Sequence, residues 1–356
     1  RSGCRLRNMK AVGGEVAGRG RAHRTVPRRV ASGRRLSGAG PRTSAPLKPH
    51  RCQRQTHAHI FARPDRAFLR HLEQEGYAVV ANVLSAASRA TFMRGFWKSA
   101  KQVVPGLRPK KRSTWRFPSG YRGIMCAYGL AQADFAWVPR LAPKVRKAFA
   151  AVYDIGPKDL VVSLDAVLLS DSVPKKVPQP WLHKDQSADD ARRQRSYQGI
   201  YTAVSVGSAD AGTVLVPRSH LRVYRWERRH TGQHLKAPDE VAARLLNQVV
   251  KPFVPANGLL VFNSRLLHAN EPARRFRDET GPGGLPLPNR LALAVCFAPR
   301  QRRSEATLAK KEAAYFGGKT SNHWPCDRFN LKRPRPWDFI KGGRRLPTPP
   351  RDRRRL

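Results

Sequence analysis

The sequence predicts a mainly β protein with flanking helices (α+β), and three observations lead to this class. Short apolar and β-branched runs, separated by Pro and Gly, begin at Asp159 and are typical of a β-sandwich or barrel. Apolar residues at helical spacing precede these runs. The chain has 356 residues, 40% of them hydrophobic, which suffices for one large domain with extensions or two medium ones.

The helical part begins near Asp65. The stretch "DRAFLRHLEQEGYAVV" predicts a short amphipathic helix followed by a strand over residues 77–80. Ser85 is a candidate N-cap for a second helix in "SAASRATFMRGFWKSAKQVV", and residues 143–154 predict a third. The aromatic residues of "YGLAQADFAWVPRLAP" lie at near-helical spacing, and we expect them to pack in the core.

Six later runs predict strands. They are residues 160–170, 198–206, 212–217, 248–255, 258–263 and 290–299. The following stretch "KKEAAYFGGKTSNHWP" is expected to begin as a helix, and its His323 and Trp324 belong either to a C-terminal lid or to ordinary packing.

The formal charge of +45 is unevenly distributed: residues 1–60 hold +14 and residues 301–356 hold +11. Residues 1–60 predict a disordered basic segment whose composition suits a mitochondrial or plastid transit peptide, and residues 341–356 predict a disordered basic tail. Residues 61–340 form the predicted domain between them. We therefore expect an intracellular protein, in a mitochondrion or plastid if the segment is a transit peptide and otherwise in the cytoplasm.

Composition also bears on several other classes of protein. The five cysteines are scattered without a C-x-x-C pair, which argues against a zinc module and a disulfide-stapled secreted fold. No apolar run approaches the length of a membrane span. The basic charge attracts nucleic acid, but the tails contain no helix-turn-helix, zinc-finger or RNP-like signature. Nucleic-acid binding is thus a minor alternative that stays open.

The stretch "VPQPWLHKDQ" contains the first candidate metal ligands, His183 and Asp185. In an extended segment residues i and i+2 point to the same side, so both side chains can face one cavity while Lys184 points away. The two prolines of the stretch stiffen the approach. The competing interpretation is a hydrogen-bonded pair in an ordinary loop.

A second histidine, His268, follows the predicted strand in "NGLLVFNSRLLHANEP", and Arg290 opens the next strand. Two histidines and one carboxylate can occupy one face of an octahedral iron and leave three positions open. An arginine at the base of such a pocket can hold a carboxylate through its planar guanidinium.

These motifs, in this order, resemble the phytanoyl-CoA dioxygenase-like (PhyH) branch of the Fe(II)/2-oxoglutarate-dependent oxygenases. The matching stretches are "FLRHLEQEGYAVVANVLS", "WLHKDQ", "GTVLVPRSH", "LLVFNSRLLHAN" and the arginine that opens the next strand. The resemblance covers roughly residues 65–300. It implies a double-stranded β-helix, which is the jelly-roll, cupin-like core of that family.

The resemblance also implies a site and a reaction. Iron would be held by His183, Asp185 and His268, and 2-oxoglutarate would meet Arg290 through its far carboxylate. The expected reaction is hydroxylation of a small organic substrate with O2, releasing succinate and CO2. Because the carboxylate of Asp185 is retained, hydroxylation or a related oxidation is favoured over halogenation.

The chain departs from the family pattern at two places, one of which is Arg218, where the family has a glycine. The other is the interval before Arg290. His268 and Arg290 are further apart than usual, with "RRFRDETGPGGLPLP" resembling a loop insertion. Arg274 and Arg275 are therefore rival candidates for the cosubstrate carboxylate.

Further polar residues are candidates for supporting roles around the same site. Gln198, Tyr201 and Asn270 are candidate contacts of 2-oxoglutarate, whereas His220 is expected to fix a loop or support the ligands. The basic middle of the chain hints at an anionic substrate, although compositional bias explains it equally well.

Two other functions are kept beside the oxygenase. One is a non-catalytic domain of this type that binds an anionic ligand or nucleic acid through its basic surface. The other is a cupin-like enzyme, such as an isomerase, that uses another metal. The complete set of candidate ligands argues against the first.

Overall fold

The computed structural model describes residues 58–117, 123–229, 233–281 and 284–349. Almost all of the predicted basic segment over residues 1–60 lies outside these ranges, as do the last seven residues of the predicted tail. Among the described residues, no helix combines the length and the apolar character needed to cross a membrane.

The first helix and strand form as the sequence predicts. In α1 (Arg66–Glu75), the Asp65 carboxylate accepts hydrogen bonds from the first backbone N–H groups, and Gly76 ends the helix in the left-handed conformation (φ 87°). The chain then enters β2 (Tyr77–Val80), all four residues of which are buried. The predicted Ser85 cap begins α2 (Ala86–Val103).

A mixed seven-stranded sheet is the larger of the two main sheets. In spatial order its strands are β1 (Ile60–Phe61), β2, β10 (Gly258–Asn263), β7 (Tyr197–Thr202), β12 (Arg290–Ala294), β5 (Val167–Ser170) and β3 (Ile124–Met125). Only the β1–β2 pair is parallel within this order.

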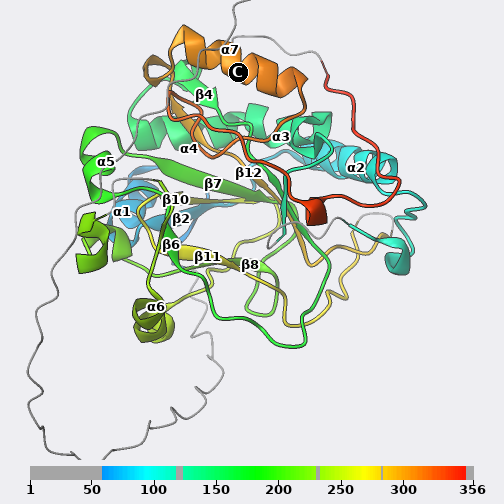
Figure 1. The fold of residues 1–356 in the computed structure, drawn as a ribbon, viewed down its shortest axis with the longest axis horizontal. Coiled ribbons are helices and arrows are strands. Elements are labelled where there is room, and N and C mark those ends of the chain that lie inside the picture. The colour runs from blue at the N-terminus through cyan, green and yellow to red at the C-terminus, as the bar shows by residue number, and fades with distance from the viewer. Residues whose placement is uncertain (1–57, 118–122, 230–232, 282–283, 350–356) are drawn as a thin grey trace, which may run out of the picture. The chain divides into compact units, whose positions relative to one another are not determined.

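A smaller four-stranded sheet has the order β8 (Gly212–Leu215), β11 (His268–Glu271), β6 (His183–Lys184) and β9 (Leu235–Lys236). A separate two-stranded pair joins β4 (Leu160–Val162) to β13 (Phe297–Pro299). Figure 1 shows β6, β8 and β11 on one side of the large sheet. The helices α2, α3 (Asp134–Leu141) and α4 (Pro143–Tyr153) lie on its other side.

The main hydrophobic core lies between these three helices and the large sheet. Phe92 and Phe96 of α2 pack against Phe135 of α3, and Phe92 also contacts Tyr201 of β7. Further along the chain are α5 (Ala188–Arg193), α6 (Asp239–Leu245) and α7 (Glu305–Phe316). The predicted class, mainly β with flanking helices, is confirmed.

Three of the predicted strands differ from the structure. Residues 160–170 and 290–299 each divide into two strands that join different sheets, as β4 and β5, and as β12 and β13. Residues 248–255 form isolated bridges at Val250 and Val254 in place of a continuous strand. This last run contains two prolines, which have no N–H for a ladder hydrogen bond.

The predicted disordered tail also differs over its described part. Leu346 is buried, and its N–H donates to the carbonyl oxygen of Tyr128 at 2.9 Å. Arg345 donates to the carbonyl oxygen of Phe316 at 3.2 Å. Residues 341–349 therefore pack against the domain through the buried Leu346 and these hydrogen bonds.

Candidate metal centre

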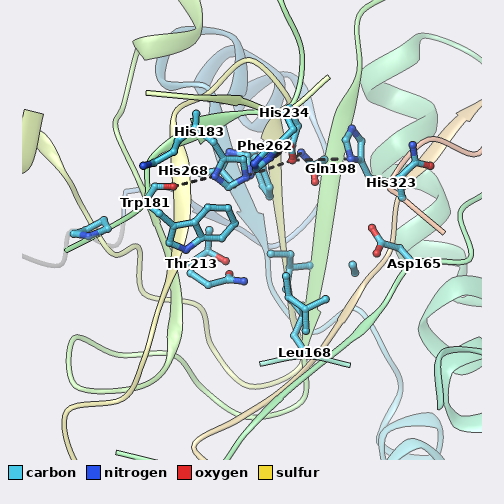
Figure 2. Close-up of a pocket in the computed structure, with 18 of the residues that line it drawn as sticks. Asp165, Leu168, Trp181, His183, Gln198, Thr213, His234, Phe262, His268 and His323 are labelled. Atoms are coloured by element: carbon cyan, nitrogen blue, oxygen red, sulfur yellow. Dashed lines mark hydrogen bonds and ion pairs between the residues drawn. The ribbon is translucent and has the colours of Figure 1, made fainter. Parts of the chain in front are cut away.

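A cavity of about 770 Å³ lies between the two main sheets (Figure 2). The large sheet lines it with residues that include Gln198 and Phe262, and the small sheet lines it with His183, Thr213 and His268. The predicted metal ligands therefore open into this cavity.

The sheet register brings the two predicted histidine ligands together. His183 of β6 and His268 of β11 are direct antiparallel partners, although 85 positions separate them in the sequence. Asp185 follows β6, and its N–H donates to the carbonyl oxygen of Ser264 at 2.8 Å. One potential ligand atom from each of His183, Asp185 and His268 lies within 4.8 Å of the others, so the three can hold a metal ion.

The two imidazole rings are oriented by backbone carbonyl groups. His183 Nδ1 lies 3.2 Å from the carbonyl oxygen of Trp181, and His268 Nδ1 lies 2.8 Å from that of Leu266. A neutral ring that donates its Nδ1–H leaves the Nε2 lone pair as the ligand. The Nε2 atoms lie 3.6 Å (His183) and 3.4 Å (His268) from the Asp185 carboxylate.

The electrostatics favour the protonation states that a metal requires. Burial, together with the neighbouring His268, lowers the pKa of His183 to about 3, so this ring is neutral. Burial opposes ionisation of Asp185, but His183, His234 and His268 outweigh it and hold its pKa well below the usual range. A neutral imidazole and an ionised carboxylate are the metal-binding forms.

Other side chains fix this arrangement from inside the cavity. Gln198 donates from Nε2 to Asp185 Oδ2 at 2.9 Å, so this candidate cosubstrate contact holds the carboxylate. His234 Nδ1 lies 3.4 Å from Asp185 Oδ1. The Trp181 ring stacks on His183 with centroids 4.1 Å apart. Nothing in the sequence around His234 marks it as part of the site.

Lys184 points away from the cavity, as the alternation of an extended segment predicts. Its Nζ lies 2.5 Å from Glu227 Oε1 and donates to the carbonyl oxygen of Arg222 at 2.9 Å. Both charged side chains of the pair are buried. Burial lowers the pKa of Lys184 to about 8, and Glu227 opposes this fall. The pair therefore anchors the strand that carries His183 from behind.

Replacing Lys184 with methionine is expected to destabilise the fold by about 3–5 kcal/mol, because it leaves the Glu227 carboxylate buried without its paired cation. Urea denaturation measures this loss. Lys236→Met is the matched control, since the Lys236–Asp239 pair is exposed and is expected to contribute at most about 1 kcal/mol. Equal midpoints for the two variants would contradict the anchoring role.

Arg290 is buried at the start of β12 and has no carboxylate partner among the described residues. Its guanidinium donates to Thr213 Oγ1 at 3.2 Å, and burial lowers its pKa to about 10. It lines a second cavity of about 400 Å³. Asn270 lines both this cavity and the first, so it lies where the two adjoin.

The rival arginines lie elsewhere. Arg274 pairs with Glu271 at 3.1 Å, and both Arg274 and Arg275 are exposed. Neither lines either of the two cavities. Of the three candidates, only Arg290 combines burial with an uncompensated charge beside the site.

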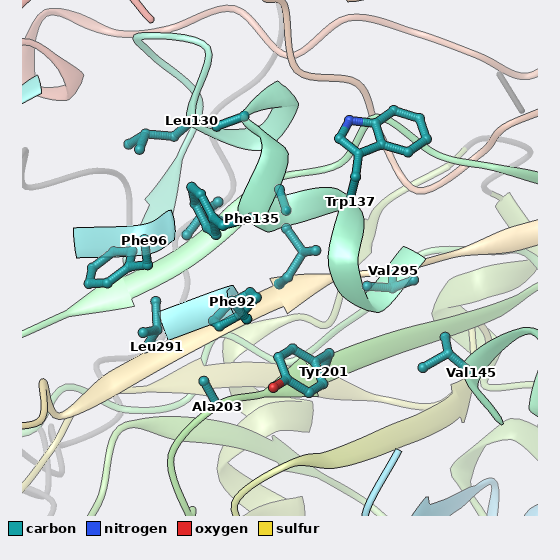
Figure 3. Packing of buried hydrophobic residues seen from close by; sticks show 14 of the residues in the cluster. Phe92, Phe96, Leu130, Phe135, Trp137, Val145, Tyr201, Ala203, Leu291 and Val295 are labelled. Carbon is teal, nitrogen blue, oxygen red and sulfur yellow. The ribbon is translucent and has the colours of Figure 1, made fainter. Parts of the chain in front are cut away.

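Tyr201 does not line the cavity, so its predicted contact with the cosubstrate finds no support in the structure and stays a prediction. Gln198 and Tyr201 are three positions apart on β7, and residues an odd number apart in a strand face opposite sides of the sheet. Figure 3 shows Tyr201 among the core side chains, and its ring lies 5.1 Å from that of Phe92. Its neighbour Ile200 lines the cavity instead.

His220 has the loop-fixing position that the sequence favours. Its ring is buried, and Nε2 lies 2.9 Å from the carbonyl oxygen of Glu73 at the end of α1. The ring packs so closely against Gly76 that a Cβ added there would lie 2.5 Å from Nδ1. It is absent from the group of side chains that can hold a metal.

No protein-family model matches the sequence, and no curated protein matches it. Solved structures with similar folds include AviO1 from Streptomyces viridochromogenes Tue57, at 18% identity over 67% of this chain and 96% of AviO1, with a TM-score of 0.45. HygX from Streptomyces hygroscopicus, solved with nickel and 2-oxoglutarate bound, has 15% identity over 66% of this chain and 87% of HygX, with a TM-score of 0.42.

A third similar structure is the epimerase SnoN in complex with Fe3+, alpha ketoglutarate and nogalamycin RO. It has 17% identity over 65% of this chain and 82% of SnoN, with a TM-score of 0.43. Enzymes that use iron and 2-oxoglutarate are thus among the structures similar to this chain. At these identities and TM-scores, the function of this chain has to be inferred from its own side chains.

Proposed function

We propose that this protein is an Fe(II)- and 2-oxoglutarate-dependent dioxygenase that hydroxylates a small organic substrate and releases succinate and CO2. One observation carries the proposal: His183 and His268 are paired across two strands and direct their Nε2 atoms toward the Asp185 carboxylate inside a cavity. Two imidazoles and one carboxylate are the donor set of non-haem Fe(II) oxygenases.

The donor set fits Fe(II) on chemical grounds. Imidazole nitrogen is a suitable ligand for iron, and one carboxylate reduces the net charge of the site without filling the coordination sphere. Both histidines have their Nδ1 atoms engaged by backbone carbonyls, which prepares the Nε2 atoms. When bound, Fe(II) with 2-oxoglutarate and O2 supplies the oxidising power for hydroxylation.

Arg290 is the proposed partner of the far carboxylate of 2-oxoglutarate. A buried guanidinium without a carboxylate is costly, and an anionic ligand compensates it. Thr213 Oγ1 lies 3.2 Å from this guanidinium and can donate to the same carboxylate. Asn270, between the two cavities, is the second proposed contact.

The remaining side chains hold the site in place. Gln198 fixes the free rotation of the Asp185 carboxylate, and Trp181 covers one face of the His183 ring. The Phe262 ring, whose centroid lies 4.7 Å from that of His268, limits water beside the ligands. These residues orient the ligands and exclude water, which is the contribution of the protein in a cofactor-dependent oxidation.

We further infer that the two sheets around the cavity form the double-stranded β-helix of the PhyH-like branch, with the catalytic domain over residues 61–340. The enclosure of the His183, Asp185 and His268 site between a seven-stranded and a four-stranded sheet supports this inference.

The first test is an anaerobic titration of the full chain with Fe(II) and then 2-oxoglutarate. A visible metal-to-ligand charge-transfer band is expected, because the keto acid chelates the iron. Succinate formation in air is the second readout, and it separates an oxygenase from an isomerase that uses the same ligands. A folded, iron-loaded chain without the band would overturn the proposed function and favour a non-catalytic binding domain.

A further inference from the structure

The cavity has a polar wall that comes from outside the predicted strands. Residues 319–332 fold back on themselves through a bridge between Ser321 and Leu331. Ser321 also binds Leu164 twice: its N–H donates to the Leu164 carbonyl at 2.9 Å, and its hydroxyl accepts from the Leu164 N–H at 3.1 Å. These bonds fix the segment beside Asp165.

His323 is the buried member of this wall. It lines the cavity with 8% of its surface exposed, and neither ring nitrogen hydrogen-bonds to any described residue. Its Nδ1 lies 4.0 Å from Asp185 Oδ2, beyond hydrogen-bond distance. The next residue, Trp324, is buried in packing, so the segment presents His323 to the cavity and anchors itself through Trp324.

Asp165 and Lys332 form an ion pair at the same end of the cavity, with Nζ and Oδ1 2.6 Å apart. Asp165 Oδ1 also accepts from the N–H of Ala166, whereas Oδ2 takes no hydrogen bond from the described residues. Figure 2 shows Asp165 and His323 together, across the cavity from Trp181. This end thus combines a free carboxylate oxygen, an ammonium group and an imidazole.

The charges of the cavity do not follow the charge of the chain. Its described lining contains Asp165, Asp185, Lys236, Asp239 and Lys332, so acids are not outnumbered by bases. The two lysines are each paired with an aspartate, at 3.0 Å and 2.6 Å. The +45 of the chain therefore lies mostly outside the described lining of this cavity.

We propose that Asp165, His323 and Lys332 form a subsite for hydroxyl groups, and that the substrate is a neutral, hydroxyl-bearing molecule with an apolar ring or chain. A hydroxyl group is both a donor and an acceptor, so it can donate to the Asp165 carboxylate and accept from Lys332 or His323. The apolar part fits against the Trp181, Leu168 and Phe262 side chains, which also line the cavity. This inference rests on the proposed function, because it places the hydroxyl-bearing end beside Asp185.

The test measures binding of three probes to the full chain by ligand-observed NMR, with and without Zn(II) and 2-oxoglutarate. The probes are phenyl glucoside, the phenyl tetrahydropyranyl ether that lacks the hydroxyl groups, and phenyl glucuronide, which adds a carboxylate. We expect the glucoside to bind at least about tenfold more tightly than the ether. We expect this ratio of affinities to fall by about tenfold in each of three variants, Asp165→Asn, His323→Phe and Lys332→Met.

Lys319→Met is the matched control for Lys332→Met, because Lys319 belongs to the same segment but is exposed outside the cavity. It is expected to bind all three probes as the parent does. The proposed subsite is wrong if the parent protein does not bind the glucoside, or if it binds the glucuronide more tightly. It is also wrong if all three cavity variants still prefer the glucoside over the ether as strongly as the parent does.

The charge-transfer titration on the same proteins keeps the two proposals apart. The parent protein could lack the band and still bind the glucoside through Asp165 and His323. This result would contradict the oxygenase function and support the subsite. A parent with the band and no preference for hydroxyl groups would leave the oxygenase and overturn the subsite.

Discussion

His183→Ala is expected to abolish both the visible charge-transfer band and succinate formation. The substitution removes one of three ligands, and the remaining His268 and Asp185 cannot hold the ion against water and buffer. The fold should persist, because the backbone pairing of β6 with β11 does not need the ring. The measurement is the anaerobic titration, with metal content determined after gel filtration.

His71→Ala is the matched control for this loss. His71 is a half-buried histidine on α1, and it does not line the cavity. The band should persist in this variant. A band of undiminished intensity in His183→Ala would show that the metal is held elsewhere, and the proposed ligand set would then be wrong.

Arg290→Met is expected to weaken the binding of 2-oxoglutarate by about 2–5 kcal/mol, which corresponds to roughly 30-fold or more. The methionine fills similar space but cannot bind the far carboxylate, so Fe(II) binding should be retained. The dissociation constant comes from the intensity of the charge-transfer band as 2-oxoglutarate is added.

Arg274→Met and Arg275→Met are controls with the same chemical change. Both arginines are exposed and line neither cavity, so their variants should bind 2-oxoglutarate as the parent does. If affinity falls in either of these variants and not in Arg290→Met, the cosubstrate site belongs to the loop after β11.

Local sequence signals predicted the elements over residues 65–103 well. The Asp65 and Ser85 caps and the strand over residues 77–80 depend on interactions within a few residues, so they are legible in the sequence. The division of residues 160–170 and 290–299 between two sheets was not legible. It depends on which distant strand each half pairs with, and tertiary contacts decide that pairing.

The candidate site could be predicted where a short pattern carried it. His183 and Asp185 follow from the period of an extended segment, and His268 follows from its place after a buried strand. The same period of two places Gln198 and Tyr201 on opposite faces of β7. His323 lies beside Asp165 where Leu164 and Ser321 hydrogen-bond across 157 positions of sequence, a contact that no local pattern encodes.

The basic composition of the chain does not by itself decide whether the substrate is anionic. Net charge describes the whole chain, whereas recognition depends on the few side chains that face the ligand. Here those side chains include Lys236 and Lys332, each neutralised by an aspartate. The basic residues can still influence the rate at which the 2-oxoglutarate dianion approaches, and this influence would decrease with salt.

The pairing of His183 with His268 also has a consequence for how the protein acquires its metal. The strand β6 has only two residues, and it is held by neighbours far along the chain, such as Ser264 and Ala237. An unfolded or partly folded chain cannot present both rings at once. At the proposed site we therefore expect the bound ion to stabilise the small sheet, and a chelator to lower that stability.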